Sequence, residues 1–364
     1  MVTVSLCMIV KNEEDVLGRC LESAKDIFDE IIIIDTGSTD KTKEIASRYT
    51  DKIYDFEWID DFAAARNFAF SKGTCDYKFW LDADDVISET NREKLIKLKA
   101  VADGSVGVFR MYYGIVFDEK GNCTYKYYRG RMFLAKLHPI WKGRVHETCT
   151  TQTAGISIDT DIEIYHKKKT AENHTPRNLR ILKNEIESGS TDPRTQYYYS
   201  RELMYSGDYK AQIKMAEIFL ENPAGWYVNK ISACQDLAFA KMKTGDTDGQ
   251  IRALVRSFSY GAPTGEVCCD IGKFFSKRDT KTAIFWYETA LLLKPDYNSG
   301  AFINEDCYGY IPAIELCVLY YGKKDYKKAS EMNDLAAQFK PANASVLYNK
   351  SLFDKINNEI SQNE

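Results

Sequence analysis

Positions 80–85 read Trp80-Leu81-Asp82-Ala83-Asp84-Asp85, so that an apolar pair is followed by three carboxylates within four residues. The apolar run before them predicts a strand over Tyr77–Asp82, and open α/β sheets bind ligands outside the carboxyl ends of their strands. Neighbouring carboxylates raise one another's pKa unless a positive charge joins them. A divalent cation that also touches a phosphate is the natural partner, since such cations prefer oxygen ligands. The alternative is a solvated acidic loop that caps the next helix.

The first hundred residues alternate between strand-like and helix-like patterns. Strands that alternate with helices need crossover connections, which predicts a largely parallel sheet with helices on both faces. Runs rich in β-branched and apolar residues predict strands at Thr3–Val10, Glu30–Asp35, Lys52–Phe56 and Tyr77–Asp82. The predicted helices are one capped by Asn12, one at Thr39–Arg48, one from an Asp61 cap to Lys72, and one from a Thr90-x-x-Glu93 capping box to Ala102.

Two more of the predicted strands end in polar residues that would reach the same edge of the sheet. Asp35 ends one strand and precedes Thr36-Gly37-Ser38, where glycine permits a tight turn and the carboxylate can accept hydrogen bonds from a base or a ribose. Asn12 and Glu13 follow the first strand. The alternative for Asp35 is that it only starts the turn. Glycine-rich dinucleotide and P-loop motifs are absent from the sequence, so neither site is supported.

The sequence pattern changes after Gly107, where short runs rich in aromatic residues predict antiparallel strands at the edge of the sheet. A basic run at 167–170 then suggests a boundary, which divides the chain into domains at 1–170 and 171–364. The predicted edge strands are Val108–Gly114, Cys123–Tyr128, Met132–Leu134 and Ile162–His166, with a polar turn at 118–122.

The rest of the chain is predicted to be helical and shows internal similarity. The segment from Asp279 to Pro295 resembles the second helix of a tetratricopeptide repeat with its closing proline, and Asp325 to Pro341 repeats the pattern. Gly207-Asp208 and Gly245-Asp246 begin weaker copies, and Gly300–Gly309 is a candidate insertion. Stacked helix pairs of this kind leave a groove for a partner. The alternative is an ordinary helical bundle.

Composition and charge narrow the class of protein. The 364 residues are 44% hydrophobic and 28% charged, which excludes a disordered chain, and a net charge of −4 argues against binding to nucleic acid or anionic lipid. The ten cysteines lack a Cys-x-x-Cys pair and are expected to be free thiols. Val2–Val10 is too short to span a bilayer and lacks a cleavage site. These features predict a cytoplasmic protein with no transmembrane segment.

Four motifs occur in an order that resembles the family 2 glycosyltransferases. They are Ser5-Leu-Cys-Met-Ile-Val-Lys-Asn12-Glu13-Glu14, Ile34-Asp35-Thr-Gly-Ser-Thr-Asp40-Lys-Thr, Phe62-Ala-Ala-Ala-Arg66-Asn67 and Trp80-Leu-Asp82-Ala-Asp84-Asp85. The resemblance covers about residues 3–166 and implies the GT-A fold. With the added helical repeats, the chain is similar to members that modify proteins or peptides, including bacteriocin S-glycosyltransferases, or that act on surface glycans.

The resemblance also implies roles for particular residues. Asp35 matches the position near the uracil and ribose, and Trp141–Glu147 resembles the segment that supplies acceptor contacts and the general base. Arg66 would hold either the diphosphate or an aspartate of the metal motif, with a structural ion pair as the alternative. The expected catalytic residue is Glu147, with Asp85 as the second candidate. The expected substrate-binding residues are Asn12, Glu13, Asp35, Arg66, Asn67, Asp82, Arg131 and Trp141. The expected metal ligands are Asp84, Asp82, His166 and His146.

The implied reaction is inverting transfer of a hexose or N-acetylhexosamine from a UDP-sugar. UDP-glucose or UDP-N-acetylglucosamine is the expected donor, Mn²⁺ or Mg²⁺ the cofactor, and a protein, peptide or glycan the acceptor. The helical repeats would bind the acceptor or a partner, and a homo-oligomer is left open. Two alternatives remain: a partner-binding scaffold with a vestigial nucleotide-binding domain, and a nucleotidyltransferase on a related fold. For His138 and His174 a structural role is expected, and a zinc site from His146, Cys149 and Cys123 fits no known spacing closely.

Overall fold

The computed structural model describes residues 2–117, 121, 123–167, 176–297 and 299–363, which form two compact units. The units are Met1–Ser190 and Thr191–Glu364. The boundary expected after residue 170 lies in the segment 168–175, outside the described residues. The division into domains 1–170 and 171–364 therefore stays a prediction.

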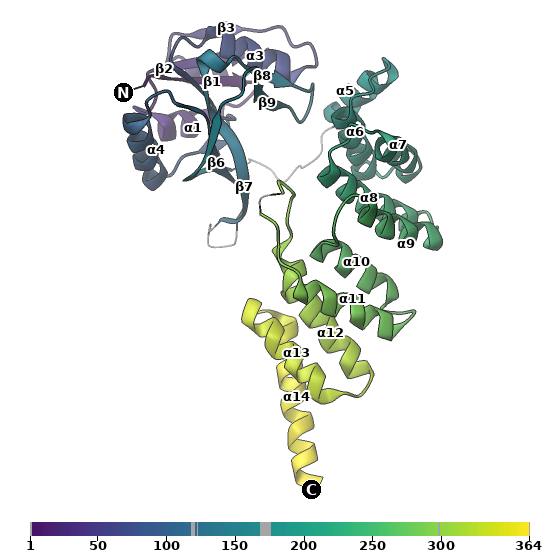
Figure 1. Ribbon diagram of the computed structural model, residues 1–364. Coiled ribbons are helices and arrows are strands. Elements are labelled where there is room, and N and C mark those ends of the chain that lie inside the picture. Colours follow the sequence, from purple (N-terminus) through teal and green to yellow (C-terminus); the bar gives the residue numbers. More distant parts are fainter. Residues whose placement is uncertain (1, 118–120, 122, 168–175, 298, 364) are drawn as a thin grey trace. The chain divides into compact units, whose positions relative to one another are not determined.

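An eight-stranded sheet forms the centre of the first unit (Figure 1). Strands β3, β2, β1 and β4 are parallel, whereas β7 runs antiparallel to both β4 and β6. The predicted mostly parallel sheet with antiparallel strands beside it is confirmed. In spatial order the strands are β3 (Ile53–Asp55), β2 (Glu30–Asp35), β1 (Val4–Val10), β4 (Tyr77–Trp80), β7 (Cys123–Leu134), β6 (Val106–Phe117), β10 (Ile156–His166) and β5 (Asp85–Val86).

The strands that follow β4 are longer and more continuous than the sequence predicts, and β10 runs parallel to β6 rather than antiparallel. The two strands expected at 123–128 and 132–134 are one strand, β7, and β10 begins at Ile156 rather than Ile162. A second, two-stranded sheet pairs β8 (Pro139–Lys142) with β9 (Thr148–Thr151). Of the predicted polar turn at 118–122, only Gly121 lies within the described residues.

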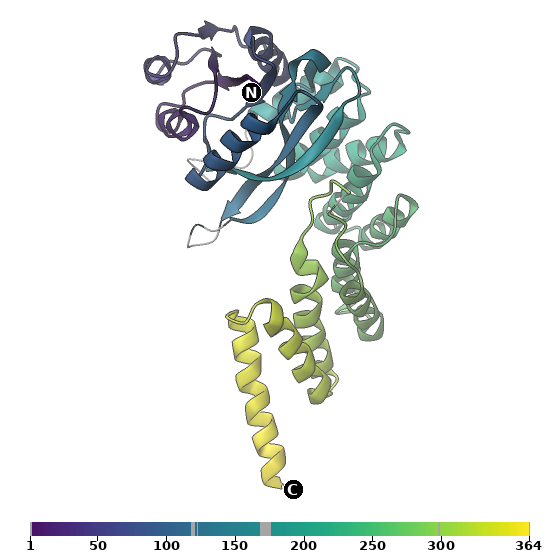
Figure 2. The same ribbon diagram turned by 60° about the vertical axis from the view of Figure 1, so that its left-hand side comes forward.

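Side chains of β1 alternate between two hydrophobic cores, one on each face of the sheet. Leu6 and Met8 pack with Leu17 and Leu21 of α1, in the core that also holds Leu95 of α4. The opposite core holds residues of α3 together with β8. Figure 2 shows α4, in dark blue, lying along the sheet. The helices of this unit are α1 (Leu17–Ala24), α2 (Thr42–Ala46), α3 (Phe62–Lys72), α4 (Glu89–Val101) and α5 (Pro176–Glu187), with a 3-10 turn at Ala135–Leu137.

One helix cap is confirmed and two are wrong. Asp61 caps α3 by accepting a hydrogen bond from the Ala64 N–H at 2.9 Å. Asn12 caps no helix, because its backbone has a φ of +55° and its side chain instead accepts from the Thr39 N–H at 2.8 Å. The predicted Thr90 cap is also wrong, since α4 begins earlier, after Ser88.

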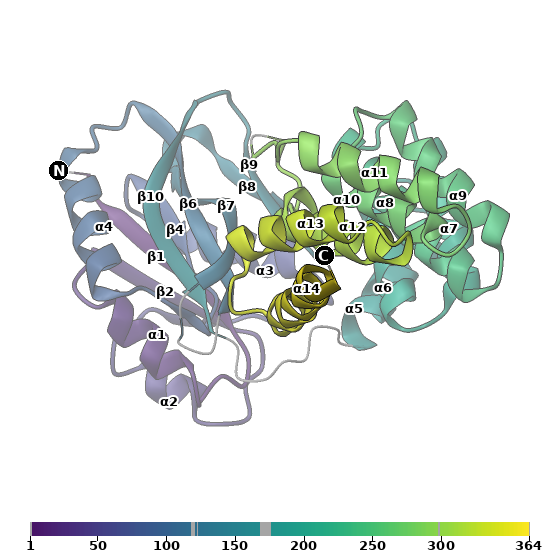
Figure 3. The same ribbon diagram turned by 90° about the horizontal axis from the view of Figure 1, so that it is seen from below.

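The second unit consists of helix pairs, as the repeat pattern predicts. Within the pairs α6·α7, α8·α9, α10·α11 and α12·α13 the two helices pack together, and Figure 3 shows α12 beside α13. The connection from Leu293 to Gly309, with a 3-10 turn at Glu305–Tyr308, contains the predicted insertion. The helices are α6 (Pro193–Tyr205), α7 (Tyr209–Glu221), α8 (Tyr227–Lys243), α9 (Thr247–Arg256), α10 (Gly265–Phe275), α11 (Thr280–Leu292), α12 (Tyr310–Gly322), α13 (Tyr326–Phe339) and α14 (Ala344–Asn363), with a 3-10 turn at Ser257–Ser259.

The second helix of each pair begins at an aspartate that the sequence pattern marks. Asp208, Asp246, Asp279 and Asp325 each accept a hydrogen bond from a backbone N–H in the first turn of their helix. Such caps satisfy N–H groups that have no partner within the helix. The repeated aspartate is therefore a structural feature of the repeats.

Two further features of the described residues concern the cysteines and the hydropathy of the helices. None of the ten cysteines forms a disulfide. No helix in the described part of the chain is both long and apolar enough to cross a membrane.

The buried Glu30 should make the first unit sensitive to acid. It receives hydrogen bonds from Ser5, from the Thr74 N–H (2.8 Å) and from Lys52 (2.6 Å). Burial alone would raise the pKa of Glu30, but these bonds outweigh it and lower the pKa to about 2. Because this pKa is lower in the folded state, the stabilisation is full above the unfolded pKa near 4.5 and is lost as the pH falls toward 2.

Glu30→Gln should therefore lower the free energy of unfolding by about 1–3 kcal/mol at pH 7, because it leaves buried donors poorly paired. The difference between variant and wild type should shrink below pH 4. Urea unfolding followed by circular dichroism at pH 7 and pH 3 measures both. An equal difference at the two pH values would contradict this role.

Candidate active site

A cleft of about 460 Å³ lies where three parallel strands end. Glu13 follows β1, Thr36 follows β2, and Asp82 and Asp84 follow β4, and all four line the cleft. The carboxyl ends of neighbouring parallel strands meet at one edge of a sheet, so the register of β1 with β2 and β4 brings these residues together.

Asp35 holds the turn beside this cleft and keeps one oxygen without a partner. It is 1% exposed, and its Oδ2 accepts hydrogen bonds from the Gly37 and Ser38 N–H groups at 3.1 and 2.9 Å. Gly37 has a φ of +95°, the left-handed conformation that favours glycine. The buried Oδ1 has no hydrogen-bond partner. An acceptor in this state is free to receive an N–H or O–H from a ligand.

Asn12 and Glu13 connect the ends of β1 and β2. The backbone N–H of Asn12 donates to Ser38 Oγ at 3.0 Å, and that of Glu13 donates to Thr42 Oγ1 at 2.7 Å. The Asn12 side chain is used by the turn, whereas Glu13 lines the cleft. Of these two predicted substrate-binding residues, Glu13 is the better placed to meet a ligand.

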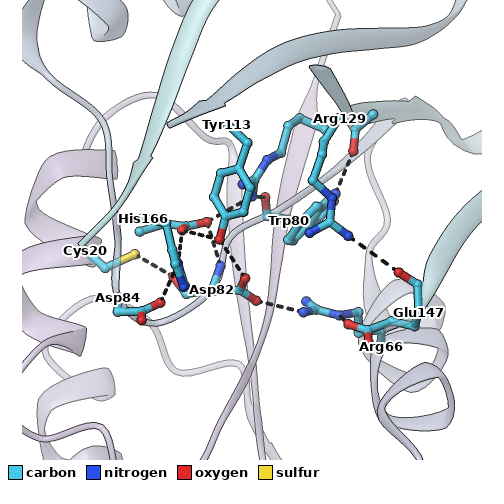
Figure 4. A network of polar contacts seen from close by, with 12 residues as sticks. Cys20, Arg66, Trp80, Asp82, Asp84, Tyr113, Arg129, Glu147 and His166 are labelled. Atoms are coloured by element: carbon cyan, nitrogen blue, oxygen red, sulfur yellow. Dashed lines mark hydrogen bonds and ion pairs between the residues drawn. The ribbon is translucent and has the colours of Figure 1, made fainter. Parts of the chain in front are cut away.

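Arg66 of α3 bridges two of the predicted site carboxylates (Figure 4). Its Nη2 donates to Asp82 Oδ1 at 2.7 Å and its Nε donates to Glu147 Oε1 at 2.6 Å. Burial would lower the pKa of the guanidinium, but the charges of Asp82 and Glu147 outweigh it and raise the pKa. For Asp82, burial raises the pKa and the charges of Arg66 and His166 lower it below its usual range. The ion pair between Arg66 and Asp82 is therefore charged at neutral pH.

Asp85 and Arg131 form a completely buried ion pair beneath the loop. Both are 0% exposed, and Arg131 Nη1 donates to Asp85 Oδ2 at 2.9 Å and to the Trp80 carbonyl at 3.1 Å. Asp85 also accepts from the Asp82 N–H at 3.0 Å and from the Tyr113 hydroxyl at 3.1 Å. No atom of either side chain faces the cleft. This geometry disfavours Asp85 as a reserve base and Arg131 as a substrate-binding residue.

Asp84 and His166 form the open part of the acidic cluster. His166 Nδ1, at the end of β10, lies 3.1 Å from both Asp84 Oδ1 and Asp85 Oδ1. Among the described residues, ligand atoms of Asp82, Asp85 and His166 lie within 4.8 Å of one another. Burial would lower the pKa of His166, but the hydrogen bonds to Asp84 and Asp85 outweigh it and raise the pKa to about 9. The cluster thus attracts positive charge.

The remaining predicted residues lie around this centre in different ways. The Asn67 side chain makes two hydrogen bonds with the Trp141 backbone, at 2.8 and 3.0 Å, and so fixes β8 against α3. Trp141 is 3% exposed and packs against Trp80. His146 is exposed and is not a member of the acidic cluster among the described residues. His174 lies outside the described residues, and His138 ends a 3-10 turn with a φ of +48°.

Sequence reasoning missed residues that the structure brings to the site. The guanidinium of Arg129 lies 4.8 Å from the centre of the Trp80 ring, and the Tyr113 hydroxyl lies 3.2 Å from Asp82 Oδ2. Arg177 of α5 lines the cleft, far from every motif along the chain. Alternation along β6 and β7 would place Tyr113 and Arg131 on a buried face, but no pattern in the sequence pairs them with Asp85.

Comparison with known proteins assigns the first unit to a class. Residues 5–157 match the family model described as glycosyl transferase family 2. This part of the chain is therefore a family 2 glycosyltransferase domain, as the four motifs predict, and the helical unit that follows is of the tetratricopeptide-like kind.

Two curated relatives and one solved structure are similar to parts of this chain. The chain is 28% identical over 211 residues to the SPbeta prophage-derived glycosyltransferase SunS of Bacillus subtilis, which covers 55% of this chain and 49% of SunS. It is 51% identical over 85 residues to a TPR repeat-containing protein of Synechococcus elongatus, covering 23% of this chain and 21% of that protein. The crystal structure of YrrB, a TPR protein, aligns with 17% identity over 48% of this chain and 81% of YrrB, at a TM-score of 0.37. The chain spans half or less of the length of both curated relatives.

Substitutions of the neighbouring Asp84 and Asp85 should distinguish a ligand-binding role from a structural one. Asp85→Asn leaves the buried Arg131 without its counter-charge, and breaking a buried ion pair costs about 3–5 kcal/mol. Asp84→Asn removes a charge from an acidic cluster at the cleft and should change stability by less than about 1 kcal/mol. Urea unfolding of the two variants compares them directly. Equal destabilisation by both substitutions would contradict this division.

Proposed function

We propose that this chain transfers a hexose or N-acetylhexosamine from a UDP-sugar to an acceptor, with the help of a divalent cation and with inversion at the anomeric carbon. The family 2 domain supports glycosyl transfer. The observation that carries the proposal is the cleft at the strand ends, which Asp82, Asp84 and His166 line, with His166 Nδ1 3.1 Å from Asp84 Oδ1. Thr36, the residue after Asp35, lines the same cleft.

Asp35 is proposed to bind the nucleoside. Its Oδ2 is committed to the turn, so only the buried Oδ1 can accept a hydrogen bond from a uracil N–H or a ribose hydroxyl. A buried acceptor without a partner costs free energy, and a ligand that supplies the donor removes this cost. The role expected from the sequence is retained.

The acidic cluster fits a divalent cation. Carboxylate oxygens with one imidazole nitrogen suit Mn²⁺ or Mg²⁺, and we assign Asp84, Asp82 and His166 as the residues that would hold it. Such a cation acts as a Lewis acid that stabilises negative charge on the leaving diphosphate. Asp85 holds the cluster in place from below, since its oxygens are used by Arg131, Tyr113 and the Asp82 backbone. His146, which is exposed outside the cluster, is a less favourable ligand.

Glu147 is proposed as the base that takes the proton from the acceptor. Arg66 holds it through Oε1, in one chain of ion pairs with Asp82, so Glu147 is fixed relative to the cation site. Proton removal by a positioned carboxylate, as the acceptor attacks the anomeric carbon, leads to inversion. Because Oε1 of Glu147 accepts from Arg66, the acceptor would have to approach the other oxygen of Glu147 or replace this contact.

UDP-glucose and UDP-N-acetylglucosamine are the donors we propose to test first, and a protein, peptide or glycan is the proposed acceptor. The helical unit is proposed to bind this acceptor or a partner protein, since stacked helix pairs present a continuous surface. If the wild-type protein releases no UDP from any UDP-sugar with Mn²⁺, the alternative of a partner-binding scaffold replaces this proposal.

Asp84→Ala should lower metal-dependent UDP release from a UDP-sugar by about 100-fold or more, because the loss of one ligand weakens the binding of the cation that the reaction needs. Isothermal titration should show that Mn²⁺ no longer strengthens UDP binding. Asp51→Ala, at an exposed aspartate that does not line the cleft, is the matched control and should behave as wild type. Normal turnover by Asp84→Ala would exclude the metal assignment.

Glu147→Gln should lower turnover by about 100-fold while the Kd for UDP changes little, because a general base acts on the acceptor and not on the nucleotide. A steady-state assay of UDP release and a titration with UDP together distinguish the two effects. Wild-type turnover would discard Glu147 as the base. A parallel loss of UDP binding would instead show that it only positions Arg66.

A further inference from the structure

The cations that line the cleft differ in whether a carboxylate already neutralises them. Arg66 is paired with Asp82 and Glu147, and His166 is paired with Asp84 and Asp85. Lys11 and Arg177 also line the cleft, and among the described residues neither has a carboxylate within ion-pair distance. Lys11 and Arg177 both have exposed side chains, but Arg177 also contacts an aromatic ring of the cleft wall. Arg177 is therefore the cation better held in place to meet an anionic ligand.

A specific contact fixes the helix that carries Arg177. The guanidinium of Arg180, one turn further along α5, makes two hydrogen bonds to the Asp60 carboxylate, at 2.5 and 2.8 Å. Asp60 also accepts a hydrogen bond from Trp58 Nε1 at 2.9 Å. Bidentate pairs of this kind set orientation as well as position. The pair thus ties α5 to the loop that forms one wall of the cleft.

Arg177 lies on the aromatic part of the same wall. Its guanidinium carbon is 4.7 Å from the centre of the Phe62 ring, and Phe62 packs edge-on against Trp58 with ring centres 4.8 Å apart. Both aromatic residues line the cleft. Burial lowers the pKa of Arg177, and the more distant charges of Glu147 and Asp60 only partly oppose this. A guanidinium that has no carboxylate within ion-pair distance can form charge-assisted hydrogen bonds with an anionic ligand.

We propose that Arg177 binds the diphosphate of the donor nucleotide, held in place by the Arg180–Asp60 pair. This inference rests on the proposed function and adds a residue to the same site. Arg177 lies beyond residue 157, where the match to the family model ends, so the family match does not itself predict this contact. Planar guanidinium groups bind phosphate oxygens in pairs, which suits a diphosphate better than a neutral sugar or base.

The test compares ligands that differ only in their phosphates. Isothermal titration of the full-length protein with UDP and with uridine, in Mg²⁺ and again in EDTA, gives the four Kd values needed. Arg177→Gln keeps part of the stem on Phe62 and removes the charge, and should raise the Kd for UDP about tenfold, the effect of one charge-assisted hydrogen bond. The Kd for uridine should be unchanged.

Two further variants separate binding from folding. Arg194→Ala removes a guanidinium that lies 4.9 Å from the Tyr198 ring in the helical unit, and should leave both Kd values at the wild-type level. Asp60→Asn weakens the hold on Arg180 and should raise the Kd for UDP by a smaller factor than Arg177→Gln. Circular dichroism melting checks that each variant is folded. A Kd for UDP in Arg177→Gln equal to the wild-type value would overturn the inference.

The remaining outcomes are also decisive. If Arg177→Gln weakens uridine and UDP equally, Arg177 supports the wall of the cleft and does not contact phosphate, so the inference fails while the proposed function stands. If the wild-type protein binds neither UDP nor uridine, the nucleotide site itself is wrong and the proposed function fails with it.

Discussion

A buried ion pair between Arg131 of β7 and Asp85 supports the whole candidate site. Neither side chain is exposed, and the Arg131 guanidinium carbon lies 3.7 Å from the centre of the Trp80 ring and 4.3 Å from that of Tyr113. Burying two charges is costly unless further hydrogen bonds satisfy them. The Asp82 N–H and the Tyr113 hydroxyl donate to Asp85, and Arg131 Nη1 donates to the Trp80 carbonyl, whereas Arg131 Nε and Nη2 have no hydrogen-bond partner among the described residues. These bonds tie the loop after β4, in its observed conformation, to β4, β6 and β7.

That conformation determines what the neighbouring aspartates can do. Asp82 is turned toward Arg66, and Asp84 lies beside His166 at the cleft. One acidic motif thus serves two purposes, since Asp85 belongs to the core and Asp84 is left for a ligand. The ion pairs from Asp82 through Arg66 to Glu147 extend the network to the second, two-stranded sheet, so the predicted base and the predicted metal ligands share one rigid support.

Much of this could be predicted from the sequence, because it depends on local patterns. The β-branched runs fix the strands, the register places Asp35 and Asp82 at one edge, and the aspartates of the helix pairs mark where helices begin. What could not be predicted depends on contacts between distant residues. Asn12 has the residue type of a helix cap, but its side chain accepts a hydrogen bond from the turn after β2. Asp85 is buried against Arg131, which lies on another strand. Arg177 lies at the cleft on a helix that Arg180 attaches to Asp60. Residue spacing contains no information about such pairings.

The central claim is that Asp82, Asp84 and His166 share one divalent cation with a bound nucleoside diphosphate. Crystals grown with Mn²⁺ and UDP, with diffraction recorded at the manganese absorption edge, test it most directly. The account predicts one strong anomalous peak at the strand ends, in coordinating distance of Asp84 and His166 and of phosphate oxygens. UDP bound in the cleft without such a peak, or a peak that none of these residues contacts, would contradict it.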